Sequence, residues 1–185
     1  MIENLIQLEA TTNLSDRMVS VRDFLEYLES TGQKAEIGPK MRLFEQLEEG
    51  PALPVTNVTW HEATDYCRWY NDQIPGAKAR LPYEWELALA EHQARLLPPD
   101  SFWGAWPMKS KAEAARVLST SGLQDWGMAD TLGVACSWTS EGSASFRVYR
   151  GGSWCYTASF LRASFRFGDG PSNRFNGLGF RLAFN

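Results

Sequence analysis

The sequence of 185 residues is poor in cysteine and histidine, and this excludes several kinds of site. Its three cysteines, Cys67, Cys136 and Cys155, are an odd and widely spaced set that gives neither a disulfide framework nor a Cys-x2-Cys metal motif. The two histidines, His61 and His92, fall in predicted helices among polar neighbours, as solvated side chains do. Zinc and iron sites need several converging nitrogen or sulfur ligands. We therefore expect no metal and no cofactor.

Long apolar runs and runs of positive charge are also missing. No stretch approaches the roughly 20 apolar residues of a membrane helix, so no membrane span is predicted. The net charge is -4 and lysine and arginine form no cluster, so nucleic acid is not an expected partner. Residues 1–18 contain Glu3 and no basic stretch before an apolar core, so they predict no signal peptide. We expect a cytoplasmic protein unless a partner carries it elsewhere.

Known catalytic motifs are absent as well. The chain has no Gly-x-Ser-x-Gly elbow, no Gly-x-Gly-x-x-Gly turn and no phosphate-binding loop of the Walker type. The carboxylates between Glu45 and Glu49 are typical of a solvated helix face. The residues alone thus indicate a scaffold without catalytic machinery, and we predict that the protein is not an enzyme.

Helices are predicted early in the chain and short strands late. The first helix begins at Ser20 and the second at Thr59, because an acidic residue three positions later completes a capping box in each case. The other expected elements are a helix that has Pro82 in its first turn and runs through residues 84–90, and strands at 54–58, 137–139, 146–150 and 179–183. This order predicts an α+β fold with a small antiparallel sheet and a loop-rich C-terminal half. No repeat or long linker divides the chain, so we expect one domain over residues 1–185.

The segment 155–177 has an unusual composition. Its aromatic residues alternate with Ser, Thr, Asn, Asp and Gly, without the period of a helix or a strand. Rigid aromatic residues among small polar ones are typical of antibody-like binding surfaces. The other interpretation is a loop-rich edge of the core in which the phenylalanines are buried. Composition alone leaves both open.

A coding argument favours the first interpretation. The segment contains no Lys, Glu, Gln, Met or Trp, although these five types supply 38 of the other 162 residues. They are the amino acids that cannot be reached when the first two bases of an Asn codon, AAC or AAT, are randomised. The segment therefore has the composition of a diversified repertoire.

Five motifs follow one another along the chain in a characteristic order. They are 54–60 with Ala63, Tyr66, Cys67 and Trp69; 80–82 with Glu84 and Glu86; Gly127, Asp130, Leu132, Gly133 and Trp138; 147–154; and 179–182. Together they resemble the formylglycine-generating-enzyme, or sulfatase-modifying factor, domains over roughly residues 16–185. The resemblance implies a C-type-lectin-type fold.

The departures from this family concern its chemistry. Its oxidase members carry a Cys-x4-Cys pair that binds copper after the Gly-Gly-Ser motif, whereas no cysteine follows Cys155. One thiolate does not give a two-sulfur site. Val134 and Ser137 replace the Asn and Glu of the family's calcium-associated segment. An oxidase acting through Cys155 is one alternative to the binding function, and a fixed structural or interaction subunit is another.

One branch of the family keeps the scaffold without the chemistry: the variable proteins of diversity-generating retroelements. Their C-terminal pattern is similar to 151–154, Ala158, Arg162, Arg166, Pro171, Arg174 and 179–182 here. Position by position, the resemblance implies a set of variable, ligand-binding residues, with Leu161 as a further candidate. These are Cys155, Tyr156, Thr157, Ser159, Phe160, Phe165, Phe167, Gly168, Asp169, Gly170, Ser172, Asn173, Phe175, Asn176 and Gly177.

The interspersed residues are then scaffold. A repertoire needs a backbone that keeps its shape whatever side chains it displays. We expect Arg162, Arg166 and Arg174 to hold the loops by hydrogen-bonding their carbonyl groups, and Trp154 and Phe180 to lie in the core. The resulting hypothesis is a hypervariable binding protein that recognises a protein or surface ligand as yet unknown.

Overall fold

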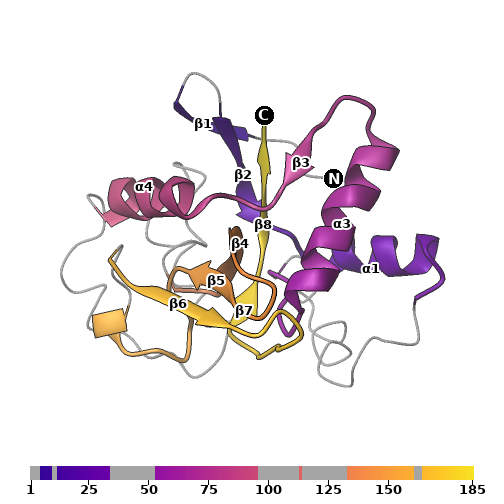
Figure 1. The fold of residues 1–185 in the computed structure, drawn as a ribbon. Helices are drawn as coiled ribbons and strands as arrows, with labels where there is room; N and C mark the ends of the chain where they lie inside the picture. Colours follow the sequence, from indigo (N-terminus) through magenta and orange to yellow (C-terminus); the bar gives the residue numbers. More distant parts are fainter. Residues whose placement is uncertain (1–4, 10–11, 34–52, 96–112, 114–132, 161–163) are drawn as a thin grey trace.

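The structure is a computed structural model that describes residues 5–9, 12–33, 53–95, 113, 133–160 and 164–185. Helices and strands alternate irregularly along the chain (Figure 1). In chain order they are β1 (Leu5–Glu9), β2 (Thr12–Met18), α1 (Val21–Ser30), α3 (Trp60–Gln73), β3 (Ala79–Arg80), α4 (Glu84–Arg95), β4 (Cys136–Gly142), β5 (Arg147–Arg150), the short 3-10 helix η5 (Ala158–Phe160), β6 (Arg166–Asp169), β7 (Leu178–Gly179) and β8 (Arg181–Phe184).

The strands form two four-stranded sheets. One has the order β1-β2-β8-β3 and is antiparallel throughout; the other has the order β6-β5-β4-β7. Strand β8 at the end of the chain lies between β2 and β3, and Ala183 is opposite both Leu14 and Arg80. Strand β7 pairs in parallel with β4. Residues 178–184 therefore take part in both sheets.

Helices α1 and α3 begin where the sequence predicts. The Ser20 hydroxyl accepts a hydrogen bond from the Asp23 amide at 3.2 Å, and the Asp23 carboxylate accepts one from the Ser20 amide at 3.3 Å. Thr59 and Glu62 form the same reciprocal pair at the start of α3. Each pair satisfies amide groups that the first turn of a helix leaves without partners. Both predicted capping boxes are confirmed.

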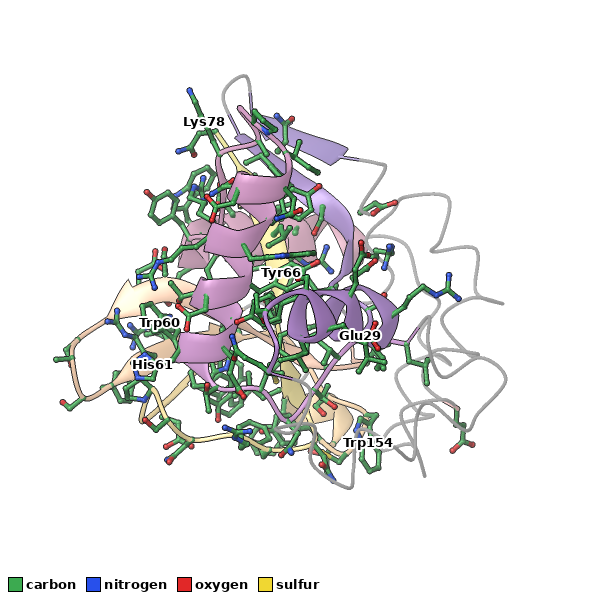
Figure 2. All side chains as sticks on the ribbon, turned by 90° about the vertical axis from the view of Figure 1, so that its right-hand side faces the viewer. Glu29, Trp60, His61, Tyr66, Lys78 and Trp154 are labelled. Carbon is green, nitrogen blue, oxygen red and sulfur yellow. The ribbon has the colours of Figure 1, made fainter. Side chains whose placement is uncertain are left out.

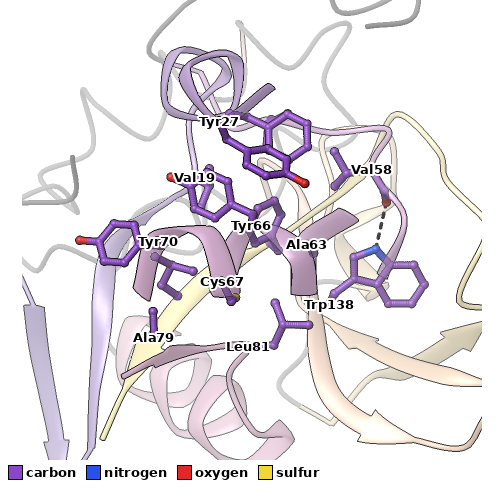
Figure 3. Packing of buried hydrophobic residues seen from close by; sticks show 14 of the residues in the cluster. Val19, Tyr27, Val58, Ala63, Tyr66, Cys67, Tyr70, Ala79, Leu81 and Trp138 are labelled. Atoms are coloured by element: carbon purple, nitrogen blue, oxygen red, sulfur yellow. Dashed lines mark hydrogen bonds between the residues drawn. The ribbon is translucent and has the colours of Figure 1, made fainter. Parts of the chain in front are cut away.

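The core is aromatic where α1 and α3 meet the strands. Tyr66 lies on the side of α3 that faces α1 (Figure 2), and its ring centroid is 5.3 Å from that of Phe180 and 5.9 Å from that of Phe24. Trp138 of β4 is fully buried and donates its indole hydrogen to the Val58 carbonyl oxygen at 3.0 Å (Figure 3). Cys67 is also buried, and burial raises the pKa of its thiol to about 12. It acts as a small apolar residue.

The α+β class is confirmed, but several predicted elements are wrong or missing. Residues 54–58 form no strand; Pro54 makes one isolated bridge to Ser20. The ladder does not continue, because the Val19 amide donates to the Phe180 carbonyl at 3.0 Å and helix α1 begins at Val21. Strands β1, β2 and β6 were not predicted from the sequence, and the second sheet is mixed because β4 and β7 run in parallel. The helix face expected at Glu45–Glu49 lies outside the described residues. Within the described ranges, no helix is both long and apolar enough to cross a bilayer.

Phe180 is expected to carry a large share of the core's stability, as predicted for a scaffold residue. It is 0% exposed and touches both helices through Phe24 and Tyr66. Replacement by alanine should lower the free energy of unfolding by about 3–5 kcal/mol, measured by urea denaturation. Phe146→Ala is the control, because that ring is 42% exposed, and should cost less than about 1 kcal/mol. Equal losses in the two variants would contradict this assignment.

Candidate functional site

The segment 155–177 forms one edge of the second sheet and the turns around it. It contains η5 and β6, and β6 is the outermost strand, paired only through β5 (Figure 1). In this ladder Tyr149 stands opposite Phe167 and Val148 opposite Gly168. Strand pairing therefore presents the segment at the margin of the fold.

The aromatic residues of the segment are collected into one group around Phe167. We call Tyr149, Tyr156, Phe160, Phe165, Phe167 and Phe175 the aromatic cluster. The Phe167 ring is stacked on Tyr149, with centroids 5.5 Å apart and an interplanar angle of 7°, and on Phe165, at 5.5 Å and 19°. Phe160 reaches Phe165 at 4.9 Å and Tyr156 at 5.9 Å. Contacts of this kind add to the stabilisation that burial gives.

The cluster has a buried side and an exposed side. Tyr149 is 7% exposed and contacts the core residue Trp138 edge-on at 5.5 Å. Tyr156, Phe167 and Phe175 are partly buried against the core, whereas Phe160 is 39% exposed. Both interpretations of the segment, as an edge of the core and as a binding surface, therefore apply to parts of the aromatic cluster. Its inner rings pack against the core, and its outer ring is exposed at the surface.

The smaller residues of the segment are mostly on the surface. Those classed as exposed are Cys155, Thr157, Ser159, Ser172, Asn173 and Asn176, while Gly168, Asp169 and Gly170 are partly exposed. The Asp169 carboxylate accepts hydrogen bonds from the Gly170 amide at 2.8 Å and from the Asn173 side chain at 2.5 Å. These bonds shape the turn after β6.

Two glycines of the segment are constrained by their neighbours. Gly177 is buried, and a Cβ atom there would lie 2.3 Å from the Ser153 hydroxyl, so a larger residue has no room without a shift of Ser153. This position does not suit a displayed side chain. A Cβ atom on Gly168 would meet the Phe146 ring at 1.9 Å, but Phe146 is an exposed side chain at a hairpin tip that is able to swing away. Residue 168 therefore sets where Phe146 lies.

The scaffold arginines bind carboxylates rather than the loop carbonyls that were expected. Arg166 donates from Nε and Nη2 to Glu84, each at 2.8 Å, and Arg150 donates to the same carboxylate at 3.4 Å. Arg174 lies 3.3 Å from a carboxylate oxygen of Glu62. A carboxylate matches the guanidinium fork in both geometry and charge, which a single carbonyl does not. Arg162 and Leu161 lie outside the described residues.

Glu84 links helix α4 to three strands of the second sheet. It begins α4, receives Arg150 from β5 and Arg166 from β6, and its amide is held by the Glu141 carboxylate of β4 at 3.0 Å. The hydrogen bonds from Arg166 lower the pKa of Glu84, although burial opposes them, and Arg150 lowers it further. Glu84 was not among the site residues predicted from the sequence, although its place in a family motif could have indicated its importance. Of the other scaffold residues, Phe180 is core as expected, while Trp154 is only partly buried.

Cys155 is a free and exposed thiol, whereas Cys67 and Cys136 are buried. Its sulfur lies 3.4 Å from the hydroxyl oxygen of Ser153. Cys136 is near enough to interact electrostatically with Cys155, but its buried thiol donates to the Gly151 carbonyl at 3.3 Å. In the part of the chain that is described, no three His, Cys, Asp or Glu residues are gathered as a metal site would require. The surroundings of Cys155 do not fit a two-sulfur copper centre.

The sequence pattern of the sulfatase-modifying factor enzyme 1-like domain matches residues 6–185. The chain belongs to this family. It is 28% identical over 205 residues to the inactive C-alpha-formylglycine-generating enzyme 2 of Bos taurus, covering 98% of this chain and 65% of that protein. It is 33% identical over 170 residues to the hercynine oxygenase of Mycolicibacterium thermoresistibile, covering 73% of this chain and 36% of the relative. The chain thus spans about one third to two thirds of the length of these relatives.

Solved structures confirm the predicted fold family. PvdO from Pseudomonas aeruginosa superposes with a TM-score of 0.66 at 18% identity, covering 94% of this chain and 80% of that one. Treponema denticola variable protein 1 superposes with a TM-score of 0.59 at 21% identity, covering 94% and 84%. The sulfatase-modifying-factor-like relatives include enzymes and proteins named inactive, so family membership alone does not decide whether this chain is catalytic.

Glu84→Gln is expected to loosen the edge of the sheet in this family member. It removes the negative charge that pairs with Arg150 and Arg166, and we expect a loss of about 1–2 kcal/mol at neutral pH, kept small because Arg166 is half exposed. Since the folded-state pKa of Glu84 is below its ordinary value of 4.5, the stabilisation is present above that pH and disappears as the pH falls through the lower folded value. The gap between wild type and variant should therefore close in acid.

Urea denaturation between pH 7 and pH 3 measures this gap. Asp65→Asn is the matched control, because it removes an exposed carboxylate that pairs with Arg68 at 2.6 Å on the surface of α3. Its effect should stay below about 0.5 kcal/mol at every pH. A Glu84→Gln penalty that is absent at pH 7, or that grows in acid, would refute the role given to Glu84.

Proposed function

We propose that this protein is a non-enzymatic binding protein whose residues 155–177 are a diversified recognition surface made by a diversity-generating retroelement. One observation carries the proposal. The segment that lacks the five amino acids unreachable from a randomised Asn codon is also the segment that forms the outer edge of the second sheet. The amino-acid composition of the segment and its place at the edge of the sheet thus point to the same part of the chain.

Backbone contacts support the proposal, because they do not depend on which side chains the segment carries. The Asn57 amide donates to the Phe175 carbonyl at 3.1 Å, and the Trp60 amide donates to the Pro171 carbonyl at 3.1 Å. The Cys136 amide donates to the Gly177 carbonyl at 2.8 Å, and β6 pairs with β5 along its length. A loop held in this way keeps its course when its side chains change.

The side chains on this surface are suited to recognition of a protein or another surface ligand. Phe160 and the partly exposed rings beside it supply apolar area with few rotatable bonds, and the exposed Thr157, Ser159 and Asn173 supply hydrogen-bonding groups. Aromatic anchors surrounded by small polar residues are typical of interface hot spots. The fold shared with a protein named variable protein 1 and the sequence similarity to a protein named inactive agree with this proposal.

Sequencing of the gene and its flanks in the source population tests the genetic part. A nearby copy of the stretch that encodes 151–182, differing only at adenines and accompanied by a reverse transcriptase, is the expected result. Variation among individuals should fall on the predicted positions other than Gly177, whose surroundings leave no room for a larger side chain. A uniform segment with no such copy would instead favour a fixed interaction subunit on the same fold.

Tolerance of diversity is a second prediction and needs no known ligand. Thr157, Ser159, Asn173 and Asn176 are replaced together with mixtures encoded by the randomised Asn codon, and the folded fraction is measured by resistance to proteolysis. Most members should remain folded, because exposed positions usually change stability by no more than about 0.5 kcal/mol each. The same mixture at the buried Val148, Tyr149 and Gly177 is the control and should unfold most members. Equal loss in the two libraries would contradict the proposal.

The oxidase alternative is tested with copper. Titration with Cu(I), read out with a thiol assay, should show no tight stoichiometric site that depends on Cys155. Tight binding that is lost in Cys155→Ala would overturn the non-enzymatic assignment.

A further inference from the structure

A cavity lies between α1 and α3, and none of the residues 155–177 lines it. Its volume is about 170 Å³. Tyr66, Trp69 and Tyr70 of α3 form one wall, and the carboxylates of Asp23 and Glu26 of α1 form the other. Figure 2 shows Tyr66 between the two helices. The cavity therefore combines an aromatic wall with an acidic one.

The aromatic wall is rigid. The Tyr66 ring lies 5.3 Å from Trp69 at an interplanar angle of 51° and 6.4 Å from Tyr70 at 33°. Tyr27 of α1 supports both Tyr66 and Trp69 from behind, at 5.5 and 5.6 Å. The faces of aromatic rings carry negative electrostatic potential, and rings inclined to one another are the geometry that holds organic cations.

The acidic wall strengthens this potential. Burial opposes ionisation of Asp23, but its hydrogen bond to Ser20 and the charge of Arg17 outweigh it and lower the pKa of this carboxyl. Arg17 lies 2.8 Å from Asp23 and balances that charge, while Glu26 is exposed and adds a further negative charge. Burial and then the charge of Asp23 raise the pKa of Tyr70, so its phenol stays neutral at physiological pH. The cavity thus has a net negative character.

We propose that this cavity binds a small organic ammonium ion. Its alkylated nitrogen lies against the rings of Trp69 and Tyr70 and is balanced by the carboxylate of Glu26. The size of the cavity limits the ligand to a compact cation rather than a long chain. The inference is independent of the recognition surface proposed above.

Isothermal titration with choline tests the proposal, with 3,3-dimethyl-1-butanol as its uncharged carbon counterpart. Saturable binding of choline and at least tenfold weaker binding of the alcohol are the expected results. Trp69→Leu should weaken choline binding by about three- to thirtyfold, the range of a cation–π contact. Glu26→Gln should weaken it by about two- to fivefold, as expected for an exposed charge pair.

Asp72→Asn is the matched control for Glu26→Gln, because it removes an exposed carboxylate from α3 that does not line the cavity. It should leave the affinity unchanged, and circular dichroism checks that each variant is folded. Absence of saturable choline binding by the wild type would overturn the proposal. Equal binding of the alcohol, or equal effects of Glu26→Gln and Asp72→Asn, would overturn the assignment of a cation site.

Discussion

The participation of residues 178–184 in both sheets is the constraint on which the rest of the structure depends. Strand β8 lies between β2 and β3, and β7, two residues earlier, is hydrogen-bonded to β4. The buried Arg181 fixes this arrangement by donating to the Ser15 carbonyl at 2.6 Å. At Gly179 the chain passes so close to the Val55 carbonyl that a Cβ atom would lie 2.1 Å from it. The residues just before this strand are therefore held at their C-terminal end by the core.

In the described parts of the segment 155–177, the course of the backbone is fixed by contacts that do not depend on the segment's own side chains, as the proposed function requires. Backbone hydrogen bonds from Asn57, Trp60 and Cys136 hold the course, and Glu84 adds charge-assisted bonds to Arg150 and Arg166. Asn57, Trp60, Cys136 and Glu84, which hold the segment, all lie outside it in the sequence. Because the contacts that hold the backbone are separate from the exposed side chains, loops on one scaffold can be changed for different functions while the framework stays the same.

The sequence predicts those features that are local or encoded by composition. The capping boxes at Ser20 and Thr59 lie within four residues and are visible without any knowledge of the fold. The ordered motifs along the chain predict the fold family. The segment 155–177 is distinguished by its composition, which lacks Lys, Glu, Gln, Met and Trp. By contrast, β2 is largely polar and becomes a strand because β8 pairs with it from the other end of the chain. Glu84 and Arg166 are 82 residues apart, and no local pattern predicts their contact.

The stack of Phe167 on Tyr149 has a consequence for any population of such proteins. Under the proposed function position 167 is variable, yet its ring covers Tyr149, a residue that contacts the core through Trp138. Glycine or aspartate at 167 would uncover Tyr149, whereas tyrosine or phenylalanine would keep it covered. Folding would then act as a first filter on the proposed diversity, ahead of any selection for binding.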